Sequence, residues 1–102
     1  MNADVTVLSK AAKDVLAERT RQISHEGWTP SHDDEHADGS LAVAAVCYTS
    51  AGTSIDFGIR YWPWDDASWK PSDVRRNLIK AGALILAEIE RLDRAEAKGG
   101  AA

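Results

Sequence analysis

The sequence predicts a small, mainly α-helical domain with three principal helices, the last of them long, and an aromatic-rich connecting loop. Three observations lead to this prediction. The chain has 102 residues, which is the size of one small domain. Apolar side chains recur at helical spacing near both ends of the chain. Residues that start and stop helices flank these segments. We expect residues 1–102 to form a single domain with flexible ends at 1–5 and 97–102.

The first helix is predicted from about Thr6 to Ser24. Gly27 follows as a stop signal, because glycine adopts the left-handed conformation that ends many helices. Charged and amide side chains, including Glu18 and Gln22, lie mostly on one side of this helix. The apolar residues fall near the opposite face, which we expect to meet the core; they are Leu8, Ala12, Val15, Leu16 and Ile23.

The second helix is predicted from about Leu41 to Ser50, with Ser40 as its N-cap. Its sequence LAVAAVCY is apolar on every side, which indicates burial all round. Cys47 has no base beside it in the sequence, so we interpret it as a buried structural cysteine. A lone cysteine forms no internal disulfide, and this favours a reducing compartment.

The third helix is predicted from Pro71 and Ser72 to the stop at Gly99–Gly100, with Ser72 capping its first turn. Its middle, AGALILA, is apolar on all faces, and the helix is long for so small a domain. Both features predict a homo-oligomer, at least a dimer. The preceding segment Ser54–Trp62 alternates apolar and polar residues in part, which allows one short strand pair. The third helix carries a continuous apolar stripe of Val74, Leu78, Ile85, Ile89 and Leu92.

Composition excludes several classes of protein. The formal net charge of −4 and the pI near 5.2 disfavour general binding of duplex DNA, which requires a basic face. No apolar run approaches the length of about 18 residues that a membrane span needs, and no signal peptide is recognisable. We therefore expect a cytoplasmic protein without membrane contact.

The segment Pro30–Ser40 concentrates side chains that bind metals. Imidazole and carboxylate together suit zinc or manganese, and carboxylates alone suit magnesium. The alternative is structural: Ser31 and Asp34 fit a loose capping box, and acidic residues are typical of a first helical turn. The spacing fits no closed zinc pattern, so we expect no metal, and any metal would be held by His32, Asp33, Asp34 and His36.

Four tryptophans lie in predicted loops, and each admits two interpretations. They can cover the open end of a helical core, or their rings can form a stacking platform for a nucleobase. Basic residues cluster where the third helix begins, and a helix start suits phosphate. Together these features predict a nucleotide site made of Trp28, Trp62, Trp64, Trp69, Arg75, Arg76 and Lys80.

The chain resembles a family of small phage and prophage proteins. The resemblance lies in ERTRQ (18–22), EGWTPSHDDEH (26–36), YWPW (61–64), WKP (69–71) and RRNLIKAGALILAEIERLDR (75–94). Parts of this pattern are similar to the phage Thoeris anti-defence sponge proteins, which sequester cyclic ADP-ribose-type or cyclic oligonucleotide signals. That similarity implies a nucleotide pocket at a chain–chain interface, in the cytoplasm of the host cell.

Other parts look like the MazG-like nucleotide pyrophosphohydrolases. These enzymes hold magnesium with an ExxE-type carboxylate set on paired helices. Here the corresponding stretch reads SLAVAAVCY and contains no carboxylate, which leaves Asp33, Asp34, Glu35 and Asp38 as substitutes. We therefore expect a small nucleotide ligand bound without hydrolysis and without a cofactor. The alternatives are a magnesium-dependent MazG-like hydrolase and an acidic protein-binding inhibitor.

Overall fold

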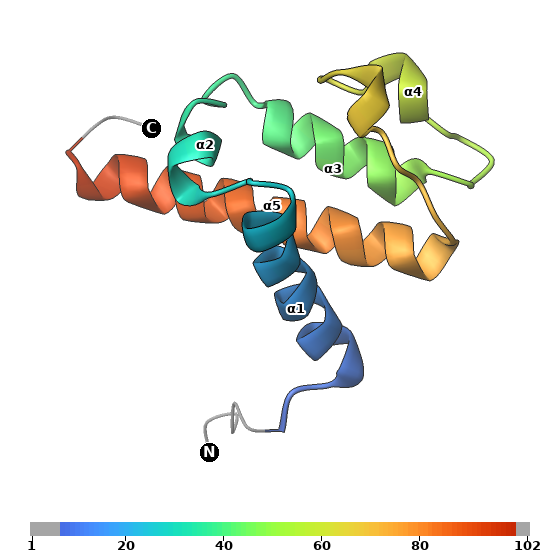
Figure 1. The fold of residues 1–102 in the computed structure, drawn as a ribbon, viewed down its shortest axis with the longest axis horizontal. Coiled ribbons are helices and arrows are strands. Elements are labelled where there is room, and N and C mark those ends of the chain that lie inside the picture. Colours follow the sequence, from blue (N-terminus) through green and yellow to red (C-terminus); the bar gives the residue numbers. More distant parts are fainter. Residues whose placement is uncertain (1–6, 100–102) are drawn as a thin grey trace.

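The fold is described by a computed structural model over residues 7–99. The predicted flexible end at residues 1–5 lies outside the described residues, and so do residues 100–102. Within the described part all regular structure is helical, which confirms the predicted mainly α-helical class (Figure 1). The elements are α1 (Lys10–His25), α2 (Pro30–Asp34), α3 (Ser40–Ser50), α4 (Gly58–Tyr61), a 3₁₀ turn (Asp66–Ser68) and the long α5 (Val74–Ala97).

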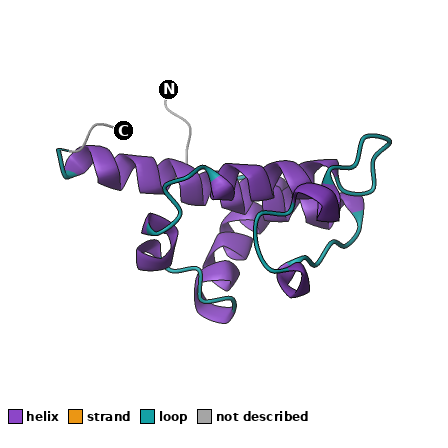
Figure 2. Ribbon diagram, turned by 90° about the horizontal axis from the view of Figure 1, so that it is seen from above, coloured by secondary structure: helices purple, strands orange, loops and turns teal. Residues whose placement is uncertain are grey.

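Helices α3 and α5 lie side by side and run in opposite directions, and α1 crosses α5 near its middle (Figure 1). Seen from above, α1, α2 and the 3₁₀ turn lie on one side of the long helix (Figure 2). The loop with most of the tryptophans leads from α4 back to the start of α5. No helix within residues 7–99 is both long enough and apolar enough to cross a membrane.

The short strand predicted in Ser54–Trp62 does not form, so that prediction is wrong. The segment instead makes a tight turn followed by α4. Asp56 closes the turn, because its two carboxylate oxygens accept hydrogen bonds from the backbone N–H groups of Gly52 (3.0 Å) and Gly58 (2.7 Å). A side chain that bonds its own neighbouring backbone offers an alternative to strand pairing.

The predicted starts of the three principal helices are all displaced. Helix α1 begins at Lys10, four residues after the predicted Thr6, with Ser9 as N-cap, whose side chain accepts a hydrogen bond from the Ala12 N–H at 3.1 Å. Helix α3 begins at Ser40 itself, with Gly39 as N-cap, because Asp38 accepts the hydrogen bond from the Ser40 N–H at 3.0 Å. Asp73 rather than Ser72 caps α5 and accepts from the Arg76 N–H.

Thr29 caps α2 and accepts a hydrogen bond from the His32 N–H, so the capping box expected at Ser31 and Asp34 is not formed. The predicted stops are confirmed, since Gly27 and Gly99 both adopt a left-handed φ of 75°.

The core is small and rich in alanine. Among the described residues, Leu41 and Leu84 are the largest fully buried apolar side chains, and Cys47 is buried as predicted. Alanines at the α3–α5 contact allow the two helices to approach closely. The prediction of burial all round α3 is wrong, because Val43 and Val46 are 41% and 51% exposed.

Helix α1 turns an unexpected face toward α5. The predicted apolar face is only partly covered, since Leu8 and Leu16 are 38% and 48% exposed. The buried side chains of α1 are instead Glu18, Arg19 and Gln22. The prediction that polar residues of this helix face away from the core is therefore wrong. Charged residues on α2 and α5 pair with Arg19 and Glu18, so these side chains can be buried.

Truncating the central leucine of α5 tests this description of the core. We expect Leu84→Ala to lower the free energy of unfolding by about 2–5 kcal/mol, because it leaves a cavity between α3 and α5. The matched control is Leu16→Ala on the exposed side of α1, with an expected loss below about 1 kcal/mol. Urea denaturation followed by circular dichroism measures both values. Equal losses of unfolding free energy in the two variants would contradict the burial of Leu84 between α3 and α5.

Candidate functional site

A buried carboxylate organises the crossing of α1 and α5. The Glu18 side chain has no exposed area and accepts hydrogen bonds from Arg21 at 2.8 Å and from Gln22 at 3.2 Å. A third partner, Arg76, reaches it from α5. Burial acts to raise the pKa of Glu18, but the hydrogen bonds and charges of the two arginines outweigh this and hold the pKa below its ordinary value.

Beside this carboxylate lies an open cleft of about 450 Å³ that we call the arginine cleft. Arg75 extends across it to Asp14, with 2.9 Å between Nη2 and Oδ2. Hydrogen bonds from Lys10 and then Arg75 hold the pKa of Asp14 below its ordinary value. The cleft therefore presents several fixed guanidinium groups close to the start of α5. Its lining is Asp14, Ala17, Glu18, Arg21, Asp73, Arg75, Arg76 and Ile79.

A second cleft of about 440 Å³, the aromatic cleft, lies on another side of the same helix start. It combines the rings of Phe57 and Trp69 with the guanidinium of Arg60. The buried Asn77 holds the backbone at one edge of this cleft. Its side chain exchanges two hydrogen bonds with the backbone of Ser72, at 2.7 and 3.0 Å. The lining residues are Ala51, Gly52, Asp56, Phe57, Gly58, Ile59, Arg60, Trp69, Pro71, Ser72 and Asn77.

Lys80 and Trp28 line a small hollow between α1 and the aromatic loop, together with Arg21 and Tyr48. The Lys80 ammonium donates to the Lys70 carbonyl at 2.6 Å and lies 5.3 Å from the centre of the Tyr48 ring. Burial, followed by the nearby charge of Arg76, lowers the pKa of Lys80. The hollow shares Glu18 and Arg21 with the arginine cleft.

The tryptophans of the loop pack mainly on one another and on the core. Trp62 is 7% exposed, and its indole N–H donates to the Asp65 carbonyl and the Ser68 hydroxyl. Its ring centre lies 5.2 Å from that of Trp64 and 4.9 Å from that of Trp69. Trp62 thus packs as part of the hydrophobic core. Trp69 is half-buried and also borders the aromatic cleft.

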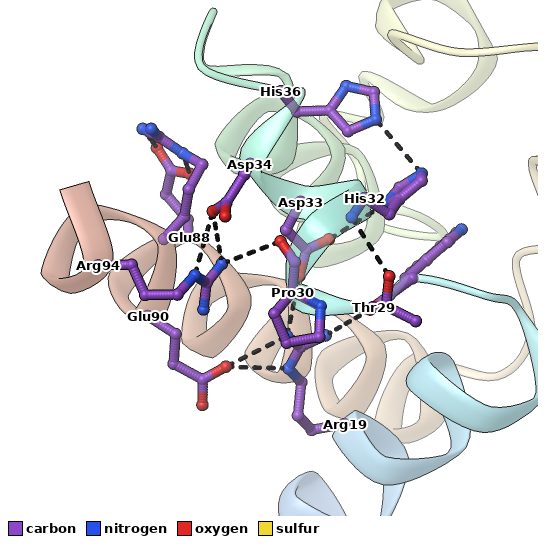
Figure 3. A network of polar contacts seen from close by, with 12 residues as sticks. Arg19, Thr29, Pro30, His32, Asp33, Asp34, His36, Glu88, Glu90 and Arg94 are labelled. Atoms are coloured by element: carbon purple, nitrogen blue, oxygen red, sulfur yellow. Dashed lines mark hydrogen bonds and ion pairs between the residues drawn. The ribbon is translucent and has the colours of Figure 1, made fainter. Parts of the chain in front are cut away.

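Two carboxylates of the segment Pro30–Ser40, those of Asp33 and Asp34, are already paired (Figure 3). Asp33 is buried and accepts a hydrogen bond from Arg19 at 2.8 Å, and Asp34 binds Arg94 of α5 at 2.8 Å. Arg19 also bonds Glu90 of α5 at 3.2 Å. Within residues 7–99, no group of three or more His, Cys, Asp or Glu side chains is placed to hold a metal.

The structure therefore divides the predicted site residues. Arg75 and Arg76 share the arginine cleft, Trp28 and Lys80 share the small hollow, and Trp69 borders the aromatic cleft. Trp62 and Trp64 belong to the aromatic packing. Reasoning from the sequence missed the polar residues of α1, although their spacing of three and four places them on one helical face. The residues missed are Asp14, Glu18, Arg21, Gln22, Phe57 and Arg60.

Comparison with models of protein families finds no match to this chain. Comparisons with curated proteins and with solved structures find no significant match either.

The buried carboxylate makes stability depend on pH. Because the pKa of Glu18 is lowered in the folded state, its contribution is complete above its unfolded pKa of about 4.3 and is lost as the pH falls below that value. We expect Glu18→Gln to cost about 3–5 kcal/mol at pH 7, the range for breaking a buried ion pair, and less at pH 3.

Guanidinium denaturation between pH 3 and pH 7 measures this dependence. The control is Glu96→Gln, which makes the same substitution at an exposed residue near the end of α5 and should cost about 0.5 kcal/mol or less. A Glu18→Gln cost that stays constant across this range would contradict the role given to the carboxylate.

Proposed function

We propose that the protein binds a small nucleotide at the start of α5 and sequesters it without chemical change. One observation carries the proposal: the first turn of α5 lies between the aromatic cleft and the arginine cleft. Pro71, Ser72 and Asn77 line the first, and Asp73, Arg75 and Arg76 line the second. A ligand that spans this turn meets aromatic rings on one side and guanidinium groups on the other.

Each half of such a ligand has a chemical counterpart in the protein. The rings of Phe57 and Trp69 suit stacking by a base, and the forked donors of Arg75 and Arg76 suit phosphate. The positive end of the α5 dipole adds to the attraction for phosphate. The two clefts, of about 450 and 440 Å³, fall in the range of small-molecule sites.

The carboxylates of the arginine cleft favour binding over hydrolysis. Glu18 is occupied by Arg21 and Arg76, Asp14 bonds Arg75, and Asp73 caps the helix. These bonds hold the arginines in place before a ligand arrives and leave the carboxylates committed to protein partners. The resemblance to phage sponge proteins adds the expectation that the ligand is a cyclic ADP-ribose-type or cyclic oligonucleotide signal.

We also propose that a second copy of the chain covers the outer face of α3 and α5. This face carries Val46, Ile85 and Ile89, each 47–51% exposed, around an apolar groove of about 230 Å³. A single chain fully buries few large apolar side chains while it leaves this face open. The groove lining is nearly free of charge, so an identical face can meet it across a two-fold axis without charge repulsion.

Removing one arginine tests the nucleotide site. We expect Arg75→Ala to weaken nucleotide binding by about 1.5–3 kcal/mol, the range for a hydrogen bond to a charged group, with little effect on folding. Its ion pair with Asp14 is largely exposed to solvent. Calorimetric titration with cyclic ADP-ribose, cyclic dinucleotides and nucleoside triphosphates measures the affinities.

Arg94→Ala is the matched control, because this arginine lies at the other end of α5 and should not change nucleotide affinity. Heat denaturation of the complex should return the ligand intact. New products in the supernatant would instead indicate the magnesium-dependent hydrolase. Equal affinities for the parent and Arg75→Ala would place the site elsewhere.

A charged substitution in the apolar face tests the proposed dimer interface. We expect the parent protein to be at least a dimer by light scattering at tens of micromolar. Ile89→Asp should yield a monomer of unchanged helical content, because it buries a carboxylate at the contact. Leu16→Asp, at a residue of similar exposure on α1, should leave the dimer intact. A parent protein that is monomeric at this concentration would rule the interface out.

A further inference from the structure

We propose that His32 and His36 bind a divalent transition-metal ion such as Zn²⁺, Ni²⁺ or Cu²⁺. The Nε2 atoms of the two rings face each other at 3.3 Å (Figure 3). Two imidazoles that bind one tetrahedral zinc at about 2.0–2.1 Å hold their nitrogens about 3.3 Å apart. The separation in the protein therefore equals the spacing that a shared ion requires.

The proton positions on His32 favour metal binding. Its Nδ1 lies 3.3 Å from Oδ1 of Asp33, and an ionised carboxylate only accepts hydrogen bonds. A neutral His32 that donates this bond carries its proton on Nδ1, which leaves the lone pair of Nε2, on the side of His36, for an ion. A carboxylate that orients a histidine in this way is a common outer partner in metal sites, where it fixes the ring and raises its basicity.

This orientation is anchored deep in the fold. Asp33 is completely buried and accepts a hydrogen bond from Arg19 at 2.8 Å. Arg19 in turn bonds Glu90 of α5 at 3.2 Å and the Trp28 carbonyl at 3.3 Å. The histidine pair is thus connected to α1 and α5 through a chain of bonds. A pair that only met by chance on the surface would lack this support.

Aromatic rings lie beside both histidines. The Trp28 ring is nearly parallel to that of His32, with 11° between the planes, and the Trp64 ring centre lies 5.2 Å from that of His36. His32 is 34% exposed, so an ion can reach the pair from solvent. Two protein ligands leave the remaining positions of the ion to water, which predicts affinity in the micromolar range.

Within residues 7–99 no third His, Cys, Asp or Glu side chain is placed to join the pair, and the adjacent Asp33 and Asp34 bind Arg19 and Arg94. The ligand set is therefore purely imidazole, which selects transition metals over magnesium and calcium. The competing account is that one histidine simply donates a hydrogen bond to the other. If the two rings only share a hydrogen bond, an added ion does not bind the pair. If they form a metal site, one ion binds, and loss of either ring abolishes that binding.

The test uses the full chain without a purification tag, stripped of metal and titrated with ZnCl₂ and with NiCl₂ at pH 7.4. We expect one saturable site per chain with a dissociation constant in the micromolar range. His32→Ala and His36→Ala should each weaken binding at least tenfold. His25→Ala is the matched control, because His25 bonds Ser24 at the end of α1, and it should bind metal like the parent.

Tryptophan fluorescence gives a second readout. Cu²⁺ bound at the pair should quench emission from Trp28 and Trp64 in the parent and in His25→Ala, and not at the same concentration in His36→Ala. Circular dichroism checks that each variant is folded. If His32→Ala does not fold, His36→Ala decides the question, since His36 follows α2. Absence of saturable binding below millimolar metal, or equal binding in parent and His36→Ala, would overturn the proposal.

Discussion

The buried carboxylate of Glu18 is the interaction on which the arrangement of the helices depends. It lies where α1 crosses α5 and is bonded by Arg21, Gln22 and Arg76. An ionised group in such a place is strongly unfavourable unless partners surround it, so the helices can cross only where those partners meet. Polar residues of α1 therefore determine where this helix lies against the rest of the chain. The position of α1 in turn sets the positions of Trp28 and α2, which follow it directly.

A second chain of polar contacts extends the same principle to α2. Arg19 joins α1 to Asp33, and Arg94 joins Asp34 to α5 (Figure 3). A five-residue helix has little stability of its own, so these ion pairs and the cap at Thr29 hold it in place. Buried polar networks of this kind specify one arrangement, because any other leaves a charge unpaired. Both the arginine cleft and the histidine pair are consequences of these networks.

Apolar packing between α3 and α5 stabilises the fold in a different way from these polar networks. Alanines bring α3 and α5 close together, and the aromatic cluster around Trp62 closes one end of the contact. Beside the buried Leu41 and Leu84 the packing uses small residues, and larger aliphatic side chains such as Val46, Ile85 and Ile89 remain on the outside. The small residues on the inner face of α3 and α5 allow the two helices to approach closely. The apolar side chains on the outer face stay exposed. The first turn of α5 stands where the aromatic cover and the polar network meet, which explains why two clefts adjoin it.

Local signals in the sequence determined the mainly helical class, the long last helix, the stops at Gly27 and Gly99 and the burial of Cys47. Helical periodicity and glycine conformation act over a few residues, so a sequence reveals them. The inward face of α1 and the pairing of Glu90 with Arg19 depended on the tertiary structure. Hydrophobicity favours Leu16 over Glu18 at a buried position, and the bonds from Arg21, Gln22 and Arg76, the last of them 58 residues along the chain, reverse that preference. The part of the compensating charge that comes from distant side chains is in place only after the chain has folded, so the sequence alone does not reveal it.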